Sequence, residues 1–401
     1  MQRIIQAAEV VKGLIYRELP MRLVLSLMFL WSATISVAQG SWYPFDLGTQ
    51  DTLRAVTFKL GLGYAVGDVF GIATGDSSVI LQTYDRGVTW VRKTFATSGR
   101  LNERRRLYSI HCITSGTCIA SGGADATPPV VRAVIYRTTD AGTNWSYLTN
   151  GPSTWWSVHC TGNTCYGASD QNVYKSTDFA LTWSGLINSG SGGRNAYAVY
   201  CMNVDTCTWG GSLGMIRKTV DGGTSWSTKS SGVTRSLRAT YLSGGNVGWT
   251  VGDTGIILKT NDSGSTWSTQ VSGTARNLRS IYFLNADTGW VVGDGGTILY
   301  TADGGVNWIP QLSGTTRNLY SVYFGSYPGI PVLGFIVGAG GTMLRYSPTV
   351  GITPGRQTKS KIHGKLNPKM EPAFDSRGKQ VEVPCRSCLL DARKESRLIG
   401  E

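Results

Sequence analysis

Short runs of alternating hydrophobic and polar residues, separated by turn residues, recur along most of the chain. In one unit the runs lie at 278–283, 289–293, 297–301 and 307–311, separated by Asn-Ala-Asp, Gly-Asp-Gly-Gly and Ala-Asp-Gly-Gly. Aspartate and asparagine favour tight turns, and glycine supplies the positive φ that many turns need. The pattern therefore predicts a unit of four short antiparallel strands.

This unit is an internal repeat. The sequence at 237–267 matches that at 278–308 after a shift of 41 residues. Its ending, Ser/Thr-x-Asp-x-Gly-x-x-Trp, recurs at six tryptophans: Trp90, Trp145, Trp183, Trp226, Trp267 and Trp308. One such meander cannot bury both of its faces, but several arranged around an axis can, so the repeats predict an all-β propeller.

The spacing of the repeats predicts seven blades. Innermost strands are expected to start near Leu53, Leu107, Trp155, Ala196, Leu237, Leu278 and Leu319. The last unit, at 319–346, has three strands and no final tryptophan, whereas Trp42 precedes Leu53 by the same eleven residues that separate Trp226 from Leu237. We therefore expect residues 42–45 to pair with the last blade and close the ring, which removes two free sheet edges.

Hydropathy and charge divide the chain into three segments. Residues 1–40 are interpreted as an upstream extension and a signal peptide, because the uncharged run from Leu23 to Ala38 follows Arg22 and ends on small residues. A stable membrane span needs about 20 apolar residues, more than this run contains. Residues 41–350 form the propeller, and residues 351–401 form a basic, flexible tail. The predicted location is extracytoplasmic: secreted, periplasmic, at the cell surface or in a thylakoid lumen.

Cysteine usage agrees with export. Six of the eight cysteines form close pairs at comparable places in three repeats: Cys112/Cys118, Cys160/Cys165 and Cys201/Cys207. Cysteines five or six positions apart across a hairpin can form disulfides in an oxidising compartment, and a metal site is the alternative. The fourth pair, Cys385 and Cys388, lies in the tail; a single Cys-x-x-Cys is weak evidence for zinc or redox chemistry, and its role stays open.

The repeated aspartates point to structure rather than catalysis. Aspartate in a tight turn accepts hydrogen bonds from nearby backbone N–H groups, and six copies are too many for one active site. The aspartates concerned are Asp85, Asp140, Asp178, Asp221, Asp262 and Asp303. The copy around Asp178 has Ala180 where the others have glycine.

The Ser/Thr-x-Asp-x-Gly-x-x-Trp motif is the Asp-box (BNR repeat) of sialidases, sortilin-like receptors and photosystem II assembly factors. The whole repeat, SGTxxxLxxIYFxxxxxGWxVGDxGxILxTxDxGxxW, resembles the photosystem II stability and assembly factor family over residues 42–346. The resemblance implies a seven-bladed, non-catalytic propeller of the thylakoid lumen or its bacterial equivalent that binds a core polypeptide during assembly. The three cysteine hairpins, the basic tail and the lack of a lipid-anchor cysteine in the apolar run depart from that family.

Arginines near the starts of the innermost strands are candidate partner-binding residues. Converging arginines favour carboxylate or phosphate groups, such as those of an acidic peptide, a C-terminus or an anionic glycan. The candidates are Arg105, Arg194, Arg235, Arg238, Arg276, Arg279 and Arg317. The alternative is local ion pairing, with Arg235 bound to Asp253 and Arg276 bound to Asp294.

The sequence argues against an enzyme. Glu103 is the only glutamate between residues 41 and 350, and His111 and His159 each precede a cysteine at the same repeat position. No nucleophile-elbow, zinc-protease or phosphate-loop motif is present. We expect no catalytic residue, metal or cofactor, a monomer without a nucleic-acid partner, and a protein partner. An Asp-box glycan-binding protein or sialidase-like glycoside hydrolase is the alternative, and the partner's identity and the photosynthetic nature of the host stay open.

Overall fold

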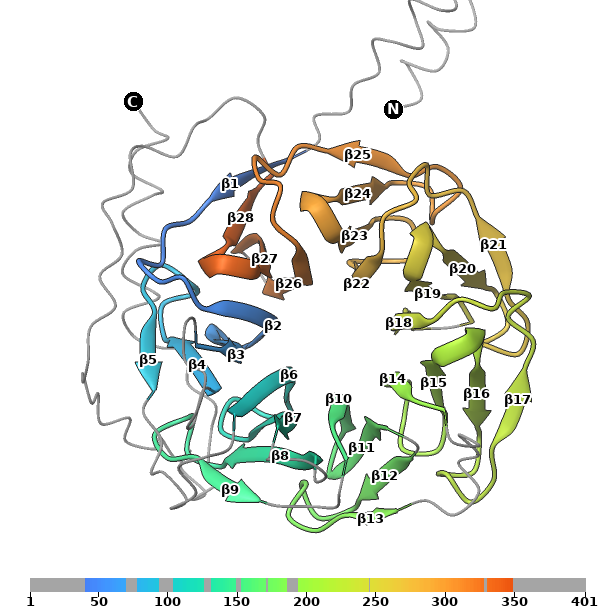
Figure 1. The fold of residues 1–401 in the computed structure, drawn as a ribbon, viewed down its shortest axis with the longest axis horizontal. Helices are drawn as coiled ribbons and strands as arrows, with labels where there is room; N and C mark the ends of the chain where they lie inside the picture. The colour runs from blue at the N-terminus through green and yellow to red at the C-terminus, as the bar shows by residue number, and fades with distance from the viewer. Residues whose placement is uncertain are drawn as a thin grey trace, which may run out of the picture. The chain divides into compact units, whose positions relative to one another are not determined.

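The computed structural model describes residues 40–348, except 70–77, 94–103, 126–130, 149–152, 171, 186–193, 245 and 328–329. Ser41–Ser347 lie in one compact unit. In this part of the chain, seven four-stranded antiparallel sheets surround a central axis as blades (Figure 1). The predicted all-β, seven-bladed propeller is thus confirmed. The predicted signal segment other than Gly40, and the tail with Cys385 and Cys388, lie outside the described residues.

Blades 1 to 3 follow chain order from the innermost strand outward. Their strands are β2 (Thr52–Lys59), β3 (Leu62–Asp68), β4 (Ser78–Thr83), β5 (Val91–Lys93), β6 (Arg104–Cys112), β7 (Cys118–Asp125), β8 (Val131–Thr138), β9 (Ser146–Leu148), β10 (Trp155–Thr161), β11 (Thr164–Ser169), β12 (Val173–Ser176) and β13 (Ser184–Gly185).

Blades 4 to 6 repeat this order. Their strands are β14 (Ala196–Cys201), β15 (Cys207–Gly211), β16 (Ile216–Thr219), β17 (Ser227–Lys229), β18 (Leu237–Leu242), β19 (Gly248–Gly252), β20 (Ile257–Thr260), β21 (Ser268–Gln270), β22 (Leu278–Phe283), β23 (Gly289–Gly293), β24 (Ile298–Thr301) and β25 (Ile309–Gln311). Blade 7 combines the two ends of the described chain, as β26 (Leu319–Tyr327), β27 (Ile330–Gly338), β28 (Met343–Ser347) and β1 (Ser41–Pro44).

The ring closes as the sequence predicts. β1 runs antiparallel to β28, with Trp42 opposite Tyr346, and the two rings lie 5.2 Å apart. The buried Trp42 indole donates a hydrogen bond of 2.9 Å from Nε1 to Oε1 of Gln311, which also accepts one of 3.1 Å from Trp290. The closing strand is therefore tied both to its own blade and to blade 6.

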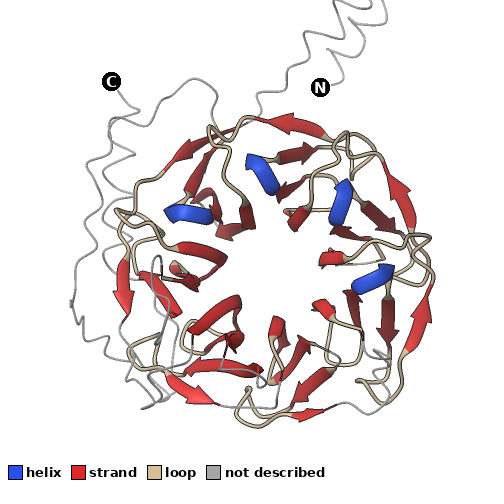
Figure 2. Ribbon diagram, viewed as in Figure 1, coloured by secondary structure: helices blue, strands red, loops and turns tan. Residues whose placement is uncertain are grey.

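Backbone hydrogen bonds assign the turns to two faces. On one face the first turn of a blade meets the aspartate turn, as where Gly222 N donates to Asp205 O. On the other face the second turn meets the link that enters the blade, as where Asp253 N donates to Ser236 O. Four of these second turns are short 3-10 turns, coloured blue in Figure 2: η1 (Ser212–Gly214), η2 (Asp253–Gly255), η3 (Asp294–Gly296) and η4 (Ala339–Gly341). We call the second face the link face.

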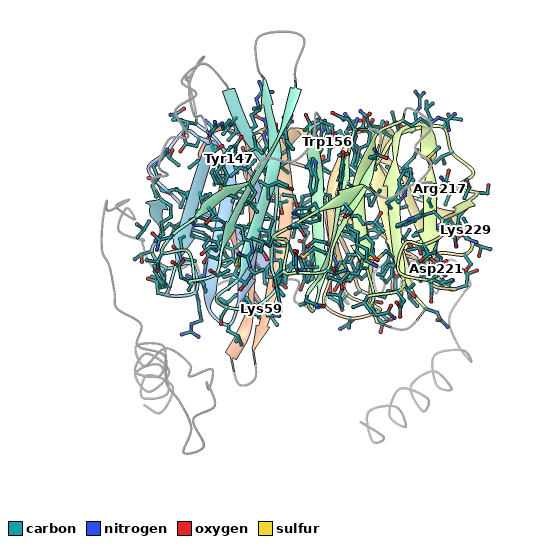
Figure 3. The ribbon with its side chains drawn as sticks, turned by 90° about the horizontal axis from the view of Figure 1, so that it is seen from below. Lys59, Tyr147, Trp156, Arg217, Asp221 and Lys229 are labelled. Carbon is teal, nitrogen blue, oxygen red and sulfur yellow. A yellow bond between two sulfur atoms is a disulfide. The ribbon has the colours of Figure 1, made fainter. Side chains whose placement is uncertain are left out.

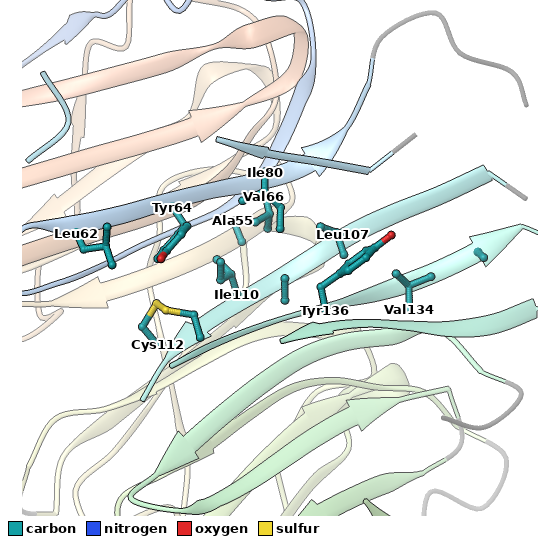
Figure 4. Close-up of a cluster of buried hydrophobic side chains, with 13 residues drawn as sticks. Ala55, Leu62, Tyr64, Val66, Ile80, Leu107, Ile110, Cys112, Val134 and Tyr136 are labelled. Atoms are coloured by element: carbon teal, nitrogen blue, oxygen red, sulfur yellow. A yellow bond between two sulfur atoms is a disulfide. The ribbon is translucent and has the colours of Figure 1, made fainter. Parts of the chain in front are cut away.

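The core consists of side chains packed between neighbouring blades. Figure 4 shows the cluster between blades 1 and 2, where Tyr64 faces Ile110 and Cys112. The predicted disulfides are present: each joins directly opposite residues of the first two strands in blades 2, 3 and 4, with Cα atoms 4.0 Å apart in all three bonds Cys112–Cys118, Cys160–Cys165 and Cys201–Cys207.

Polar side chains of the innermost strands join each blade to the next. Ser280 Oγ accepts a 3.2 Å hydrogen bond from Val322 N, and Tyr241 OH donates a 2.8 Å bond to Phe283 O. His159 occupies the repeat position of Tyr241, and its Nδ1 accepts a 3.3 Å bond from Cys201 N. Repeat position therefore accounts for this histidine.

Candidate functional site

The aspartate turns lie on the face opposite the link face and use their carboxylates locally. Asp262 accepts hydrogen bonds from Ser265 N (2.9 Å), Thr266 N (2.8 Å) and Thr266 Oγ1 (2.6 Å). The Thr182 hydroxyl and amide lower the pKa of Asp178 to about 2. A hydroxyl two residues earlier bonds the carboxylate in all six turns, at Asp85, Asp140, Asp178, Asp221, Asp262 and Asp303. These carboxylates stabilise the turns, and their local hydrogen bonds leave few acceptor sites for a substrate.

Four of the predicted arginines are exposed on the link face, two residues before an innermost strand. We call them the rim arginines: Arg194, Arg235, Arg276 and Arg317. Among the described residues, no carboxylate forms an ion pair with any of them. The Arg317 guanidinium donates to Gly340 O, and the Arg276 guanidinium lies over Gly295, whose φ of 63° suits glycine. No carboxylate of the described ranges thus compensates the charge of the rim arginines.

A second ring lies inside the first. Each innermost strand has a β-bulge near its link-face end, as between Leu237 and Ala239, and a bulge re-aims the side chain of the extra residue. These seven residues form the channel-mouth ring: Arg54, Tyr108, Trp156, Tyr197, Arg238, Arg279 and Tyr320. All are partly exposed. Figure 3 shows Trp156 near one face of the propeller and Lys59 and Asp221 near the other.

The arginines of this ring are paired with aspartates of the second turns. Arg238 binds Asp253 through two hydrogen bonds of 2.9 and 2.8 Å, and Arg279 binds Asp294 through two of 2.9 Å. Burial acts against the charge of Arg238, but its bonds to Asp253 outweigh burial and raise its pKa. In the same way, Arg279 keeps the pKa of Asp294 below its ordinary value in spite of burial.

These pairs correct one alternative from the sequence. Asp253 and Asp294 bind the arginines inside the strands, not Arg235 and Arg276 in the links. Bidentate pairing compensates the charge of Arg238 and Arg279, so neither presents the free cation expected of a partner-binding residue. Asp68 compensates the charge of Arg54 through a single contact, in which Arg54 Nε donates to Asp68 Oδ1 at 2.6 Å.

Arg105 does not join either ring. Its side chain is buried, with 1% of its surface exposed. Nη1 lies 3.4 Å from the Tyr136 hydroxyl, and the guanidinium lies 4.6 Å from the centroid of the Tyr147 ring. The expectation that Arg105 contacts a partner is therefore wrong in this fold, because aromatic side chains of its own blade cover it.

Aromatic residues complete the channel-mouth ring, and sequence reasoning missed them. Trp156 lies 4.7 Å from Tyr108 and 5.7 Å from Tyr197 between ring centroids. Arg54 stacks on Tyr108 and Tyr320, and Arg238 stacks on Tyr197. The available signal was their shared repeat position with Arg238, one residue after the position that Leu237 occupies in its repeat.

A shallow groove of about 600 Å³ opens on the link face between blades 6 and 7. It runs from the η3 glycines Gly295 and Gly296 along the link that ends at Arg317, and it includes Leu312, which is 92% exposed. Gly296 is essential to this shape, since a β-carbon there would meet the Thr315 carbonyl oxygen at 1.9 Å. The groove offers an extended segment both an apolar contact and a cation.

The described ranges offer little support for a metal site or a membrane-spanning helix. No cluster of three His, Cys, Asp or Glu side chains is placed to bind a metal ion in the described part of the chain. None of the helices described there could cross a membrane.

Comparison with known proteins finds a family-model match in the last blades. Residues 269–347 match the family model described as Photosynthesis system II assembly factor YCF48. No curated protein matches the chain. A structure described as YCF48 bound to D1 peptide is 20% identical, with a TM-score of 0.59, and the alignment covers 76% of this chain and 96% of that one.

Two further structures share the fold. YCF48 from Cyanidioschyzon merolae is 21% identical with a TM-score of 0.58, over 77% of this chain and 99% of that one. A GH74 xyloglucanase from Xanthomonas campestris is 14% identical with a TM-score of 0.56, over 79% of this chain and 55% of that one. The family model and the two YCF48 structures confirm the resemblance to photosystem II assembly factors that the repeats predict.

Proposed function

We propose that this chain is a non-catalytic propeller that binds an extended, acidic segment of a protein partner on its link face. The observation that carries the proposal is the set of four exposed rim arginines without a carboxylate partner among the described residues. Arginines gathered on one face attract carboxylates and bind them bidentately. The groove beside Arg317 offers such a segment a path along the rim.

The proposed partner is a core polypeptide of photosystem II. Support comes from the family model over residues 269–347 and from the similar structure described as bound to a D1 peptide. In a host without photosystem II, the proposed partner is another exported polypeptide with an acidic segment. We place the protein outside the cytoplasm, as a monomer; its three disulfides support the compartment.

Catalysis is not part of the proposal, because carboxylates at the channel mouth are already engaged. Asp68, Asp253 and Asp294 each bind an arginine, and Asp170 accepts a 2.7 Å hydrogen bond from the Trp156 indole. A glycosidase needs one carboxyl group held protonated as an acid and a second as nucleophile or base. These four carboxylates are engaged in structural contacts instead.

Fluorescence anisotropy with a labelled D1 peptide and the full chain tests this function. We expect binding that weakens as salt rises, because the attraction is electrostatic. The triple variant Arg235→Ala, Arg276→Ala and Arg317→Ala should lose affinity by about tenfold or more, equivalent to about 1.4 kcal/mol.

The matched control removes charge elsewhere. Lys59→Ala removes a charge at the opposite end of an innermost strand, so this variant should change affinity less than twofold. A triple variant that binds as the parent does, or a parent that fails to bind the peptide at low salt, refutes the proposed function.

A further inference from the structure

The channel-mouth ring has two chemically different halves. Blades 2, 3 and 4 contribute Tyr108, Trp156 and Tyr197, whose rings contact one another in sequence, and we call these three residues the aromatic arc. Blades 5, 6 and 1 contribute arginines paired with aspartates, and blade 7, between blades 6 and 1, contributes Tyr320, on which Arg54 stacks. An aromatic surface that is only partly covered, at the mouth of a channel, is suited to bury an apolar group of a ligand.

The charge distribution separates this surface from the rim. Each arginine of the channel-mouth ring is compensated by an aspartate. Beside the aromatic arc, Asp170 accepts a hydrogen bond from the Trp156 N–H. The rim arginines, in contrast, have no ion-pair partner in the part of the chain that the structure describes. A ligand that uses both surfaces therefore needs acidic groups for the rim and an apolar group for the mouth.

Ring geometry favours one side chain over a sugar chain. The Tyr108 and Trp156 planes are inclined by 44°, and those of Trp156 and Tyr197 by 76°. A sugar chain stacks best on aromatic faces that point the same way, whereas an inserted aromatic side chain makes edge-to-face and tilted contacts readily. The cationic rim also favours an acidic peptide over a neutral glycan.

We propose that the aromatic arc binds an aromatic side chain of the partner segment whose carboxylates are bound by the rim arginines. This inference rests on the proposed function, because it assigns a second contact to the same partner. The arc supplies specificity for one residue type, while the rim supplies charge attraction that tolerates many acidic sequences.

The repeat offers a variant that removes the aromatic ring without straining the fold. Three other blades have arginine at this bulge, paired with an aspartate fourteen or fifteen residues later, and Asp170 lies fourteen residues after Trp156. Trp156→Arg should therefore form the same ion pair as Arg238 with Asp253. An unchanged melting temperature would verify the fold.

Selection from a random 12-residue peptide library on the immobilised full chain tests the inference. On the parent we expect enrichment of both acidic and aromatic residues. On Trp156→Arg the acidic enrichment should persist and the aromatic enrichment should disappear; individual aromatic peptides should bind about tenfold more weakly, whereas their alanine analogues should be unaffected.

The outcomes separate the two proposals. The aromatic contact is overturned if the parent enriches acidic but not aromatic residues, or if aromatic enrichment persists on Trp156→Arg. Either result leaves the proposed role of the rim arginines standing. If acidic residues are enriched equally on the parent and on the variant Arg235→Ala, Arg276→Ala and Arg317→Ala, the proposed function and this inference are both overturned. The absence of any enrichment on the parent has the same consequence. Retention of xyloglucan oligosaccharides by the parent but not by Trp156→Arg would assign the arc to a glycan and also refute the inference.

Discussion

The Phe283 ring lies directly over the backbone of Gly289, its partner on the adjacent strand. A β-carbon on Gly289 would lie 2.5 Å from Cδ1 of that ring, so only glycine fits beneath it. The same arrangement occurs in two other blades, as Phe58 over Gly63 and Phe324 over Gly334. In blades 2, 3 and 4 a disulfide occupies the equivalent pair of positions. A Phe–Gly pair in some blades and a disulfide in others thus occupy the same pair of repeat positions.

This equivalence predicts that a Phe–Gly pair can replace a disulfide. Blade 4 is the best test, since Cys201 packs in one cluster with Tyr166 and Trp226, as Phe283 packs with Trp249 and Trp308. The double variant Cys201→Phe and Cys207→Gly should keep an apparent melting temperature close to that of the parent. Thermal unfolding followed by circular dichroism measures it.

The matched control is Cys201→Ala with Cys207→Ala, which removes the cross-link and leaves a cavity. Loss of a short-loop disulfide and of buried volume should cost about 3 kcal/mol. If the Phe–Gly variant is as unstable as the alanine variant, the two kinds of pair are not interchangeable.

Acidification should weaken the contact between His111 and His159, whose ring centroids lie 4.6 Å apart. Burial, reinforced by Lys59, lowers the pKa of His111 to about 4, and burial and His111 lower that of His159. Unfolded histidine titrates near pH 6.5, so the unfolded state binds more protons below that pH. Stability is then full above pH 6.5 and falls toward pH 4, by about 2–3 kcal/mol for His111.

Tyrosine at both positions should remove this dependence, because Tyr200, Tyr241, Tyr282 and Tyr323 occupy the equivalent position in other blades. Urea unfolding between pH 4.5 and 7.5 compares the parent with His111→Tyr/His159→Tyr. His363, in the tail, is present in both proteins, so any contribution it makes to the pH dependence is the same in both. Parallel pH profiles for the two proteins would contradict the prediction.

Ring closure should depend on Trp42. The side chain is 6% exposed, contacts the rings of Phe324 and Tyr346, and donates to Gln311. Trp42→Ala should destabilise the propeller by about 3–5 kcal/mol. Release of β1 would also expose the edge of β28, so we expect concentration-dependent association in size-exclusion chromatography.

A milder variant calibrates this effect. Trp42→Phe keeps an aromatic ring in the cluster but loses the N–H that Gln311 accepts, so its loss of stability should be about a third of that of the alanine variant. Closure by β1 would be unimportant if Trp42→Ala melted at the parent temperature and stayed monomeric.

The order of residues along the chain was sufficient to determine the architecture. Strand periodicity, the Asp-Gly turns and the spacing from tryptophan to the next innermost strand are local features that repeat about every 41 residues. The eleven-residue spacing before Leu53 also identified β1 as the closing strand, and the cysteine spacing identified the three disulfides. These features depend on neighbours in the sequence, so the sequence could reveal them.

The tertiary structure decided which arginines are exposed to a partner and which aromatic residues share the channel-mouth ring with Arg54, Arg238 and Arg279. Arg105 is covered by Tyr136 and Tyr147, whereas Asp253 binds Arg238 and leaves Arg235 exposed. A β-bulge shifts the register of each innermost strand, and only the circular arrangement of blades brings Tyr108, Trp156 and Tyr197 together. Burial, pairing and convergence arise from contacts between segments far apart in sequence, and a one-dimensional pattern does not specify them.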